Sequence, residues 1–244
     1  MSGPQPIEGN SNYADSALEV RNLSVRFGRS PILKDLSFTV RRATSLAIVG
    51  PNGSGKTVLF RALLGTIPAE GTVQWAQGVR VGYVPQKLDI ARDVPITGLD
   101  FLRARASLDP FSRDSISYSL ASVGLTERAA RAPIGALSGG QFQRLLVAFA
   151  LMGDPNVLLM DEPAAGVDEP GRQHLTQLVH RLQRDQGVTV LQISHDLADV
   201  CQCATMVLCL NREYVRIGPP AEVLTPELLH KLYGVPVAFN PCEL

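Results

Sequence analysis

The stretch at 50–57, GPNGSGKT, has the residue types and spacing needed to hold the phosphates of a nucleotide. The pattern G-x-x-x-x-G-K-[ST] lies between an apolar run and an amphipathic helical segment, which is the context of a phosphate-binding loop. We predict that Lys56 reaches the β- and γ-phosphates and that the Thr57 hydroxyl binds Mg²⁺. The predicted phosphate-binding residues are Gly50, Pro51, Asn52, Gly53, Ser54, Gly55, Lys56 and Thr57.

Two adjacent carboxylates follow another apolar run, in NVLLMDEP at 156–163. We expect Asp161, which ends a predicted strand, to lie beside Mg²⁺. Glu162 is expected to point to the other side of the extended backbone and to polarise an attacking water as general base. The alternative is an acid pair facing solvent, and the upstream loop makes that interpretation the less favoured one.

Three more side chains are candidates because they fall at the ends of predicted strands. His195 follows VTVLQIS and Gln86 ends VGYVPQ, so both are expected at the carboxyl edge of the sheet, where ligands bind. We predict that His195 contacts the γ-phosphate and that Gln86 contacts Mg²⁺ or the water. Phe27 closes the first predicted strand and either stacks on a purine or is a core or edge aromatic.

The stretch at 137–144, LSGGQFQR, begins a second helical segment with small residues. A helix N-terminus offers free N–H groups and a positive dipole end, which suit an anionic γ-phosphate. The residues predicted to contact phosphate there are Ser138, Gly139, Gly140 and Gln141. The chain therefore carries two separate phosphate cradles.

The segments around these motifs predict an α/β fold. Residues 18–27 and 32–40 alternate in polarity and predict an antiparallel hairpin, and 44–50 predicts a buried parallel strand. Short strands are expected in GTVQW and VRVGYV, followed by an inserted helical subdomain at about 87–150. Strand–helix alternation then resumes at 156 and predicts a mostly parallel sheet. We expect a lead-in at 1–16, one domain at 17–235 and a tail at 236–244.

Composition limits the classes of function. The 23 basic and 23 acidic residues give a formal net charge of zero, so nothing in the bulk charge favours a nucleic-acid partner. The apolar run LLVAFALM is far shorter than the roughly 20 residues that cross a bilayer. The four cysteines match no metal-binding spacing, and we interpret them as small apolar residues in a reducing compartment.

In motif content and order, the sequence from about 18 to 218 resembles the ATP-binding-cassette (ABC) ATPases. The resemblance rests on GPNGSGKT, Gln86 in VPQK, LSGGQFQR, LLMDEP, Asp168 in AAGVD and His195 in SHD. It implies ATP and Mg²⁺ as ligands and a catalytic set of Glu162, His195 and Lys56. It also implies a head-to-tail dimer, in which the phosphate loop of one copy faces LSGGQ of the other. Asp168 is then expected at the surface facing the second copy.

A finer resemblance, to the ATPases of zinc and manganese uptake systems and their iron-chelate relatives, lies in YVPQK, GVD, VLCLNR and GPPAEVLTPELLHKLYG. It implies an ATP-driven motor at the cytoplasmic face of the membrane. Integral permease subunits would dock on the helical insertion, and an extracytoplasmic substrate-binding protein would deliver the cargo. The chain departs from the common family pattern in having Ala-Gly-Val-Asp for Ser-Ala-Leu-Asp, and no Arg near Phe149.

Other functions stay open at this point. They are a motor for another cargo, a soluble ABC ATPase without a transport role, a small-molecule kinase, and an assembly protein with a vestigial site. The long heptad-patterned insertion of many non-transport relatives is missing from the sequence, and a kinase has no use for LSGGQ.

Overall fold

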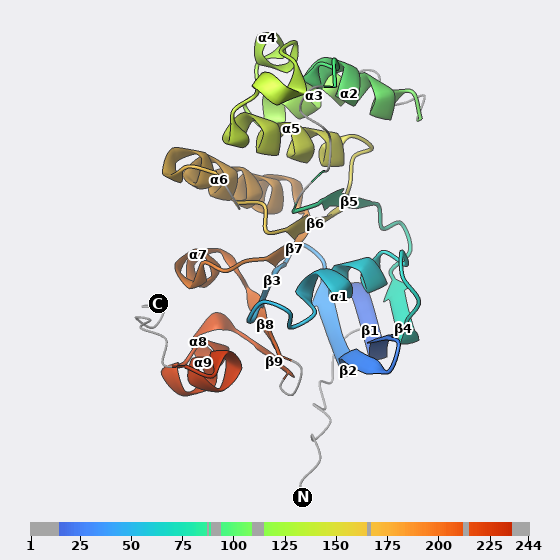
Figure 1. Ribbon diagram of the computed structural model, residues 1–244, viewed down its shortest axis with the longest axis vertical. Coiled ribbons are helices and arrows are strands. Elements are labelled where there is room, and N and C mark those ends of the chain that lie inside the picture. The colour runs from blue at the N-terminus through green and yellow to red at the C-terminus, as the bar shows by residue number, and fades with distance from the viewer. Residues whose placement is uncertain are drawn as a thin grey trace, which may run out of the picture.

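The computed structural model describes residues 15–86, 88, 94–108, 115–164, 167–211 and 215–235 (Figure 1). The predicted tail at 236–244 and nearly all of the predicted lead-in lie outside the described residues. Within the described residues, no helix is both long enough and apolar enough to cross a membrane.

An antiparallel sheet forms one flank of the molecule, with strand order β2-β1-β4. Its strands are β1 (Ser16–Phe27), β2 (Ser30–Arg41) and β4 (Glu70–Trp75). The predicted hairpin is present, since Phe27 pairs with Ser30 across a two-residue turn. Alternate residues of β1 and β2 face a core shared with α1 (Lys56–Leu63), where Phe60 is fully buried.

The main sheet has six strands in the order β5-β6-β7-β3-β8-β9. They are β3 (Ser45–Val49), β5 (Val81–Val84), β6 (Val157–Asp161), β7 (Thr189–Ile193), β8 (Met206–Leu210) and β9 (Val215–Gly218). Every pairing is parallel except that of β8 with β9. All residues of β3 and β6 are buried, which fits the continuous apolar runs in the sequence. The prediction of a mostly parallel α/β sheet with an antiparallel sheet beside it is confirmed.

Helices cover the main sheet and also gather at one end of the molecule (Figure 1). The end group is α2 (Gly98–Ala106), α3 (Ser115–Ser122), α4 (Glu127–Ala130), a 3₁₀ turn at Ile134–Ala136, and α5 (Gly139–Leu151). The others are α6 (Glu169–Gln186), α7 (Leu197–Cys203), α8 (Pro220–Val223) and α9 (Pro226–Tyr233). The end group shares a core with α6 and β6, whereas α7, α8 and α9 share a smaller one with β3 and β8.

Local sequence signals set the helix boundaries. Thr97 and Asp100 form a reciprocal capping box that starts α2. The 18-residue helix α6 ends at Gly187, whose φ of 64° is the left-handed conformation that glycine adopts without strain.

One expectation about the cysteines is wrong. Cys203 and Cys209 are free, as expected, but Cys201 is disulfide-bonded. Burial raises the pKa of the Cys209 thiol to about 12, so this side chain behaves as a small apolar group.

Candidate functional site

The phosphate loop joins the end of β3 to the start of α1. Gly55, the residue before α1, has a φ of 102°, a conformation that other residues rarely adopt. Lys56 folds back across the loop, and its Nζ donates to the carbonyl oxygens of Gly50 at 2.9 Å and Pro51 at 3.1 Å. The Ser54 hydroxyl is buried and has no hydrogen-bond partner among the described residues. The loop therefore contains a cation and an unsatisfied polar group, as a phosphate cradle requires.

Thr57 and Asp161 lie together, as the sequence predicts for residues that hold Mg²⁺. The Thr57 hydroxyl donates to Asp161 Oδ1 at 3.3 Å, and Asp161 is only 1% exposed. Burial is the main cause that raises the pKa of Asp161, and the charge of Glu162 acts in the same direction. A hydroxyl and a carboxylate are the hard oxygen donors that Mg²⁺ prefers, so the pair fits this ion.

The conformation of Glu162 corrects the sequence prediction. Its φ is 47°, so the residue is left-handed and does not continue an extended strand. Its backbone N–H donates to the carbonyl of Ile193 at 3.2 Å, which ties this turn to the end of β7. The side chain is therefore aimed by a change of backbone direction after β6 and not by strand alternation.

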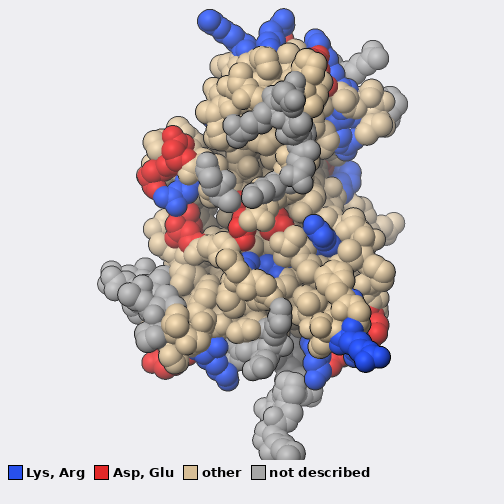
Figure 2. Space-filling view, in the orientation of Figure 1, with Lys and Arg blue, Asp and Glu red and all other residues tan. Residues whose placement is uncertain are grey.

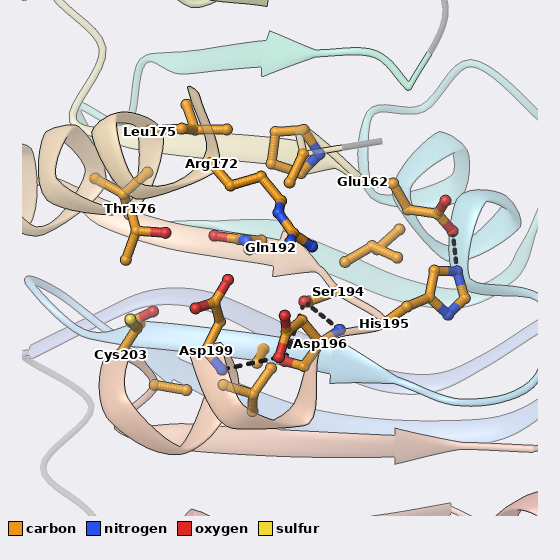
Figure 3. A pocket seen from close by; sticks show the side chains of 18 residues that line it. Glu162, Arg172, Leu175, Thr176, Gln192, Ser194, His195, Asp196, Asp199 and Cys203 are labelled. Atoms are coloured by element: carbon orange, nitrogen blue, oxygen red, sulfur yellow. Dashed lines mark hydrogen bonds and ion pairs between the residues drawn. The ribbon is translucent and has the colours of Figure 1, made fainter. Parts of the chain in front are cut away.

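The Glu162 carboxylate joins two of the other predicted residues. Gln86 Nε2 donates to Glu162 Oε2 at 2.6 Å. His195 Nε2 lies 2.5 Å from the other carboxylate oxygen, Glu162 Oε1 (Figure 3). Gln86 was predicted to contact Mg²⁺ or water, and here its side chain contacts Glu162. The three side chains come from the ends of β5, β6 and β7. They form one polar cluster at the carboxyl edge of the sheet.

Burial also affects Lys56. Desolvation lowers the pKa of its ammonium, while the nearby charges of Glu162 and Asp161 oppose that effect. Lys56 is therefore close enough to both carboxylates for their charges to raise the pKa of its ammonium group.

The second predicted cradle begins α5. Ser138 Oγ accepts from the backbone N–H of Gln141 at 3.2 Å, and Gln141 Oε1 accepts from the N–H of Ser138 at 3.0 Å. This capping box occupies the side chain of Gln141, which the sequence assigned to nucleotide contact. The N–H groups of Gly139 and Gly140, in the first turn, have no carbonyl partner within the helix. In Figure 1, α5 lies in the end group of helices, away from α1 and the first cradle.

Asp168 lies directly before α6 and beside the second cradle. Its side chain makes no capping hydrogen bond and folds back over Gly171. A Cβ on Gly171 would lie 2.6 Å from Asp168 Oδ1 and 2.5 Å from Val167 Cγ1. A Cβ on Gly140 would lie 3.8 Å from the same Asp168 oxygen. Gly171 is thus needed to place Asp168, and sequence reasoning missed it because a helical glycine by itself carries no specific signal.

Phe27 ends β1, and 52% of it is exposed. The ring is therefore not a core aromatic, whereas an edge aromatic, the other form of that interpretation, stays open. Its stacking on a purine stays a prediction.

Acidic side chains gather near the middle of the face seen in Figure 2, around a hollow below the end group of helices. A cavity of about 160 Å³ lies between α6 and α7, next to Glu162 and His195 (Figure 3). Its lining includes Arg172, Asp196 and Asp199, none of which the sequence singled out.

A complete phosphate loop, a buried acid for the metal and a carboxylate–histidine pair define a P-loop nucleoside triphosphatase. The family model for ABC transporters matches residues 33–165. The chain is 40% identical over 221 residues to the zinc import ATP-binding protein ZnuC of Cereibacter sphaeroides, covering 89% of this chain and 88% of that protein. It is 39% identical to a probable metal transport system ATP-binding protein of Thermotoga maritima, with 88% and 90% covered.

A solved structure gives the same result. A metal-chelate type ABC transporter in an inward-facing conformation superposes with a TM-score of 0.82 and 28% identity, covering 91% of this chain and 90% of that one. This protein belongs to the ABC transporter family and is an ATPase of that family. The resemblance drawn from the sequence motifs is confirmed.

The burial of Asp161 leads to a prediction about stability. Because its pKa is higher in the folded chain than in the unfolded one, ionisation of Asp161 costs folding free energy at neutral pH. Asp161→Asn is expected to increase the free energy of unfolding of the nucleotide-free chain at pH 7, on the order of 1 kcal/mol. Urea unfolding measures this difference. It should shrink as the pH falls through the folded pKa, since the wild-type carboxyl then becomes neutral.

The matched control is Asp185→Asn, which changes an exposed carboxylate and should leave the urea midpoint unchanged. Despite its greater stability, the Asp161→Asn chain should lose the thermal stabilisation that Mg²⁺ and ATP give the wild type. A lower midpoint for Asp161→Asn at pH 7 would contradict the assignment of a buried charge that its neighbours compensate only in part.

Proposed function

We propose that this protein is the ATP-hydrolysing motor of a membrane importer for a divalent metal ion, with zinc as the first cargo to test. The hydrolytic part rests on one observation above all: Glu162 contacts His195 at the sheet edge that also carries the phosphate loop. The cargo rests on the relatives, which include zinc import and metal transport ATP-binding proteins.

The residues of the site divide the chemistry between them. Lys56 would exchange its bonds to Gly50 and Pro51 for bonds to phosphate oxygens, because a charged acceptor makes the stronger hydrogen bond. Thr57 and Asp161, with Gln86, would hold Mg²⁺, which supplies positive charge against the phosphates. Glu162 would accept a proton from the attacking water, and His195 would hold the carboxylate and the γ-phosphate in place.

Two copies of the chain would form two equivalent sites. The second cradle lies on α5, in the end group of helices, so we infer that it serves the nucleotide of another copy. Head-to-tail pairing with two-fold symmetry would give each ATP a phosphate loop from one copy and Ser138, Gly139 and Gly140 from the other. ATP would then favour the closed pair because it contacts both copies, and hydrolysis would remove that preference.

The remaining partners follow from the proposed role. Integral permease subunits would bind the end group of helices and hold the chain at the cytoplasmic face of the membrane. An extracytoplasmic protein would deliver the metal ion to them. The metal would cross through the permease, so no cargo ligands are expected on this chain.

Substitution of the proposed general base tests the enzyme assignment. Glu162→Gln is expected to slow phosphate release from ATP at least about a hundredfold, because the amide cannot accept a proton. ATP binding should persist, and gel filtration should show ATP-dependent dimers that outlast those of the wild type. The control Glu70→Gln changes an exposed carboxylate and should hydrolyse ATP normally. A wild-type chain that released no phosphate would support the vestigial-site alternative, and phosphoryl transfer to an acceptor would support the kinase.

Mixing two inactive variants tests the shared site. Lys56→Ala disables the phosphate loop, and Ser138→Arg blocks the second cradle. In a mixed dimer, one site combines both lesions and the other contains neither. An equal mixture should recover about a quarter of the wild-type rate, since half of the dimers are mixed and each has one intact site. No recovery, with mixed dimers shown to form, would contradict the two-chain site.

Purification from the native membrane tests the transport role. Tagged Glu162→Gln protein, isolated with ATP and Mg²⁺, should bring down a polytopic membrane protein at near-stoichiometric yield. A strain lacking the chain should need added zinc to grow, and manganese or an iron chelate should not replace it. Rescue should come from wild type and not from Glu162→Gln. Rescue by another metal would change the proposed cargo and leave the transporter role standing. Co-purification of a soluble partner, or of none, would contradict the transporter role.

A further inference from the structure

The cavity beside Glu162 and His195 separates α6 from α7, the helices that follow these two residues along the chain. Leu175 and Val179 of α6 form one apolar wall, and Val200 of α7 faces them. Open space of about 160 Å³ separates the helices here, where packed side chains would otherwise fix their spacing. His180 of α6 contacts Cys203 of α7, with Nε2 2.9 Å from Sγ, at the end of the cavity opposite His195. Among the described residues, no hydrogen bond joins the first turns of the two helices at the His195 end.

Charged side chains lie at the end of the cavity nearest to His195. Arg172 extends from the first turn of α6, and Asp196 and Asp199 lie opposite it, at the start of α7 (Figure 3). Among the described lining residues, Arg172 is the one permanently positive side chain, against the carboxylates of Glu162, Asp196 and Asp199. Its hydrogen bond to Glu169 is the main cause that raises the Arg172 pKa, and Asp196 and Asp199 add to it.

The first turn of α7 determines where His195 lies. His195 directly precedes Asp196, whose Oδ1 accepts from the N–H groups of Ala198 at 3.0 Å and Asp199 at 3.2 Å. The His195 side chain is 43% exposed, so packing does little to fix its ring. A shift of this turn would therefore change the 2.5 Å contact between His195 and Glu162.

The two carboxylates on that turn repel one another. Burial raises the pKa of Asp199 and the charge of Asp196 raises it further, whereas Arg172 lowers it. Asp199 makes no hydrogen bond or ion pair with another described side chain, so the guanidinium across the cavity is the main charge that offsets this repulsion. Without it, we expect the turn to shift, because the open cavity beside it leaves room for a displacement.

We propose that Arg172 is a positioning residue for ATP hydrolysis, which holds the first turn of α7 through Asp196 and Asp199 so that His195 meets Glu162. This inference rests on the proposed roles of His195 and Glu162. Arg172 is also bonded through its backbone N–H to the carbonyl of Asp168, at 2.9 Å. Arg172 therefore lies one helical turn from the residue expected to face the second copy, and across the cavity from the turn that follows His195.

A substitution that removes the positive charge of Arg172 and keeps a side chain of similar length tests the proposal. Arg172→Met in the full chain is expected to lower kcat about tenfold, as misplacement of a catalytic group does. KM and ATP binding should stay unchanged, because the phosphate loop does not involve Arg172. The imidazole resonances of His195 should shift in the same variant. Arg172→Lys should restore part of the rate, because it keeps the positive charge.

Arg181→Met is the matched control, since it removes an exposed arginine from the same helix, and its kcat should be that of the wild type. Asp199→Asn should lower kcat less than Arg172→Met, and the double variant should lose less than the product of the two losses. Independent effects of the two substitutions, or a loss confined to KM, would overturn the proposal. If Arg172→Met does not fold, Arg172→Lys and Asp199→Asn decide the same question.

The proposed function and this inference fail in different ways. If His195→Ala abolishes hydrolysis while Arg172→Met leaves kcat unchanged, Arg172 has no positioning role and the ATPase assignment stands. If the wild-type chain does not hydrolyse ATP, the proposed function itself is wrong.

Discussion

The parallel register of β3, β6 and β7 places the carboxyl ends of these three strands at the same edge of the main sheet. Ile193 of β7 lies opposite Ile48 of β3 and also opposite Asp161 of β6. The phosphate loop, Glu162 and His195 therefore leave the sheet side by side, although more than 100 residues separate the first from the others. A slip of one residue in either pairing would turn the buried and functional side chains to opposite faces, so the apolar cores that fix this register also fix the site.

Burial gives the few charges at this edge their effect. Asp161 is almost inaccessible to water, and Lys56 is partly desolvated. Charges in such surroundings interact more strongly than exposed ones, because water screens them less. The same burial destabilises the folded chain when no nucleotide is bound. The charge of Asp161 is only partly offset by its neighbours, and the Ser54 hydroxyl has no hydrogen-bond partner among the described residues. Binding of an anionic ligand with its metal ion would relieve both costs.

The start of α6 lies between the second cradle and the first turn of α7. Asp168 rests over Gly171 and close to Gly140 of the second cradle, while Arg172 faces the start of α7. One helical turn therefore lies beside both the surface that we propose faces the second copy and the turn that follows His195. The glycine at 171 permits this because any larger residue would displace Asp168.

The sequence by itself determined the class of fold, the phosphate loop, the carboxylates of 161 and 162 and the second cradle. These depend on local spacing and on apolar periodicity, which are written in contiguous residues. Only the tertiary structure decided that Glu162 is left-handed, that Gln86 and His195 share its carboxylate, and that a cavity places Arg172 opposite Asp199. Each of these depends on neighbours from remote parts of the chain, and no local pattern specifies the direction of a side chain relative to a partner that far away in sequence.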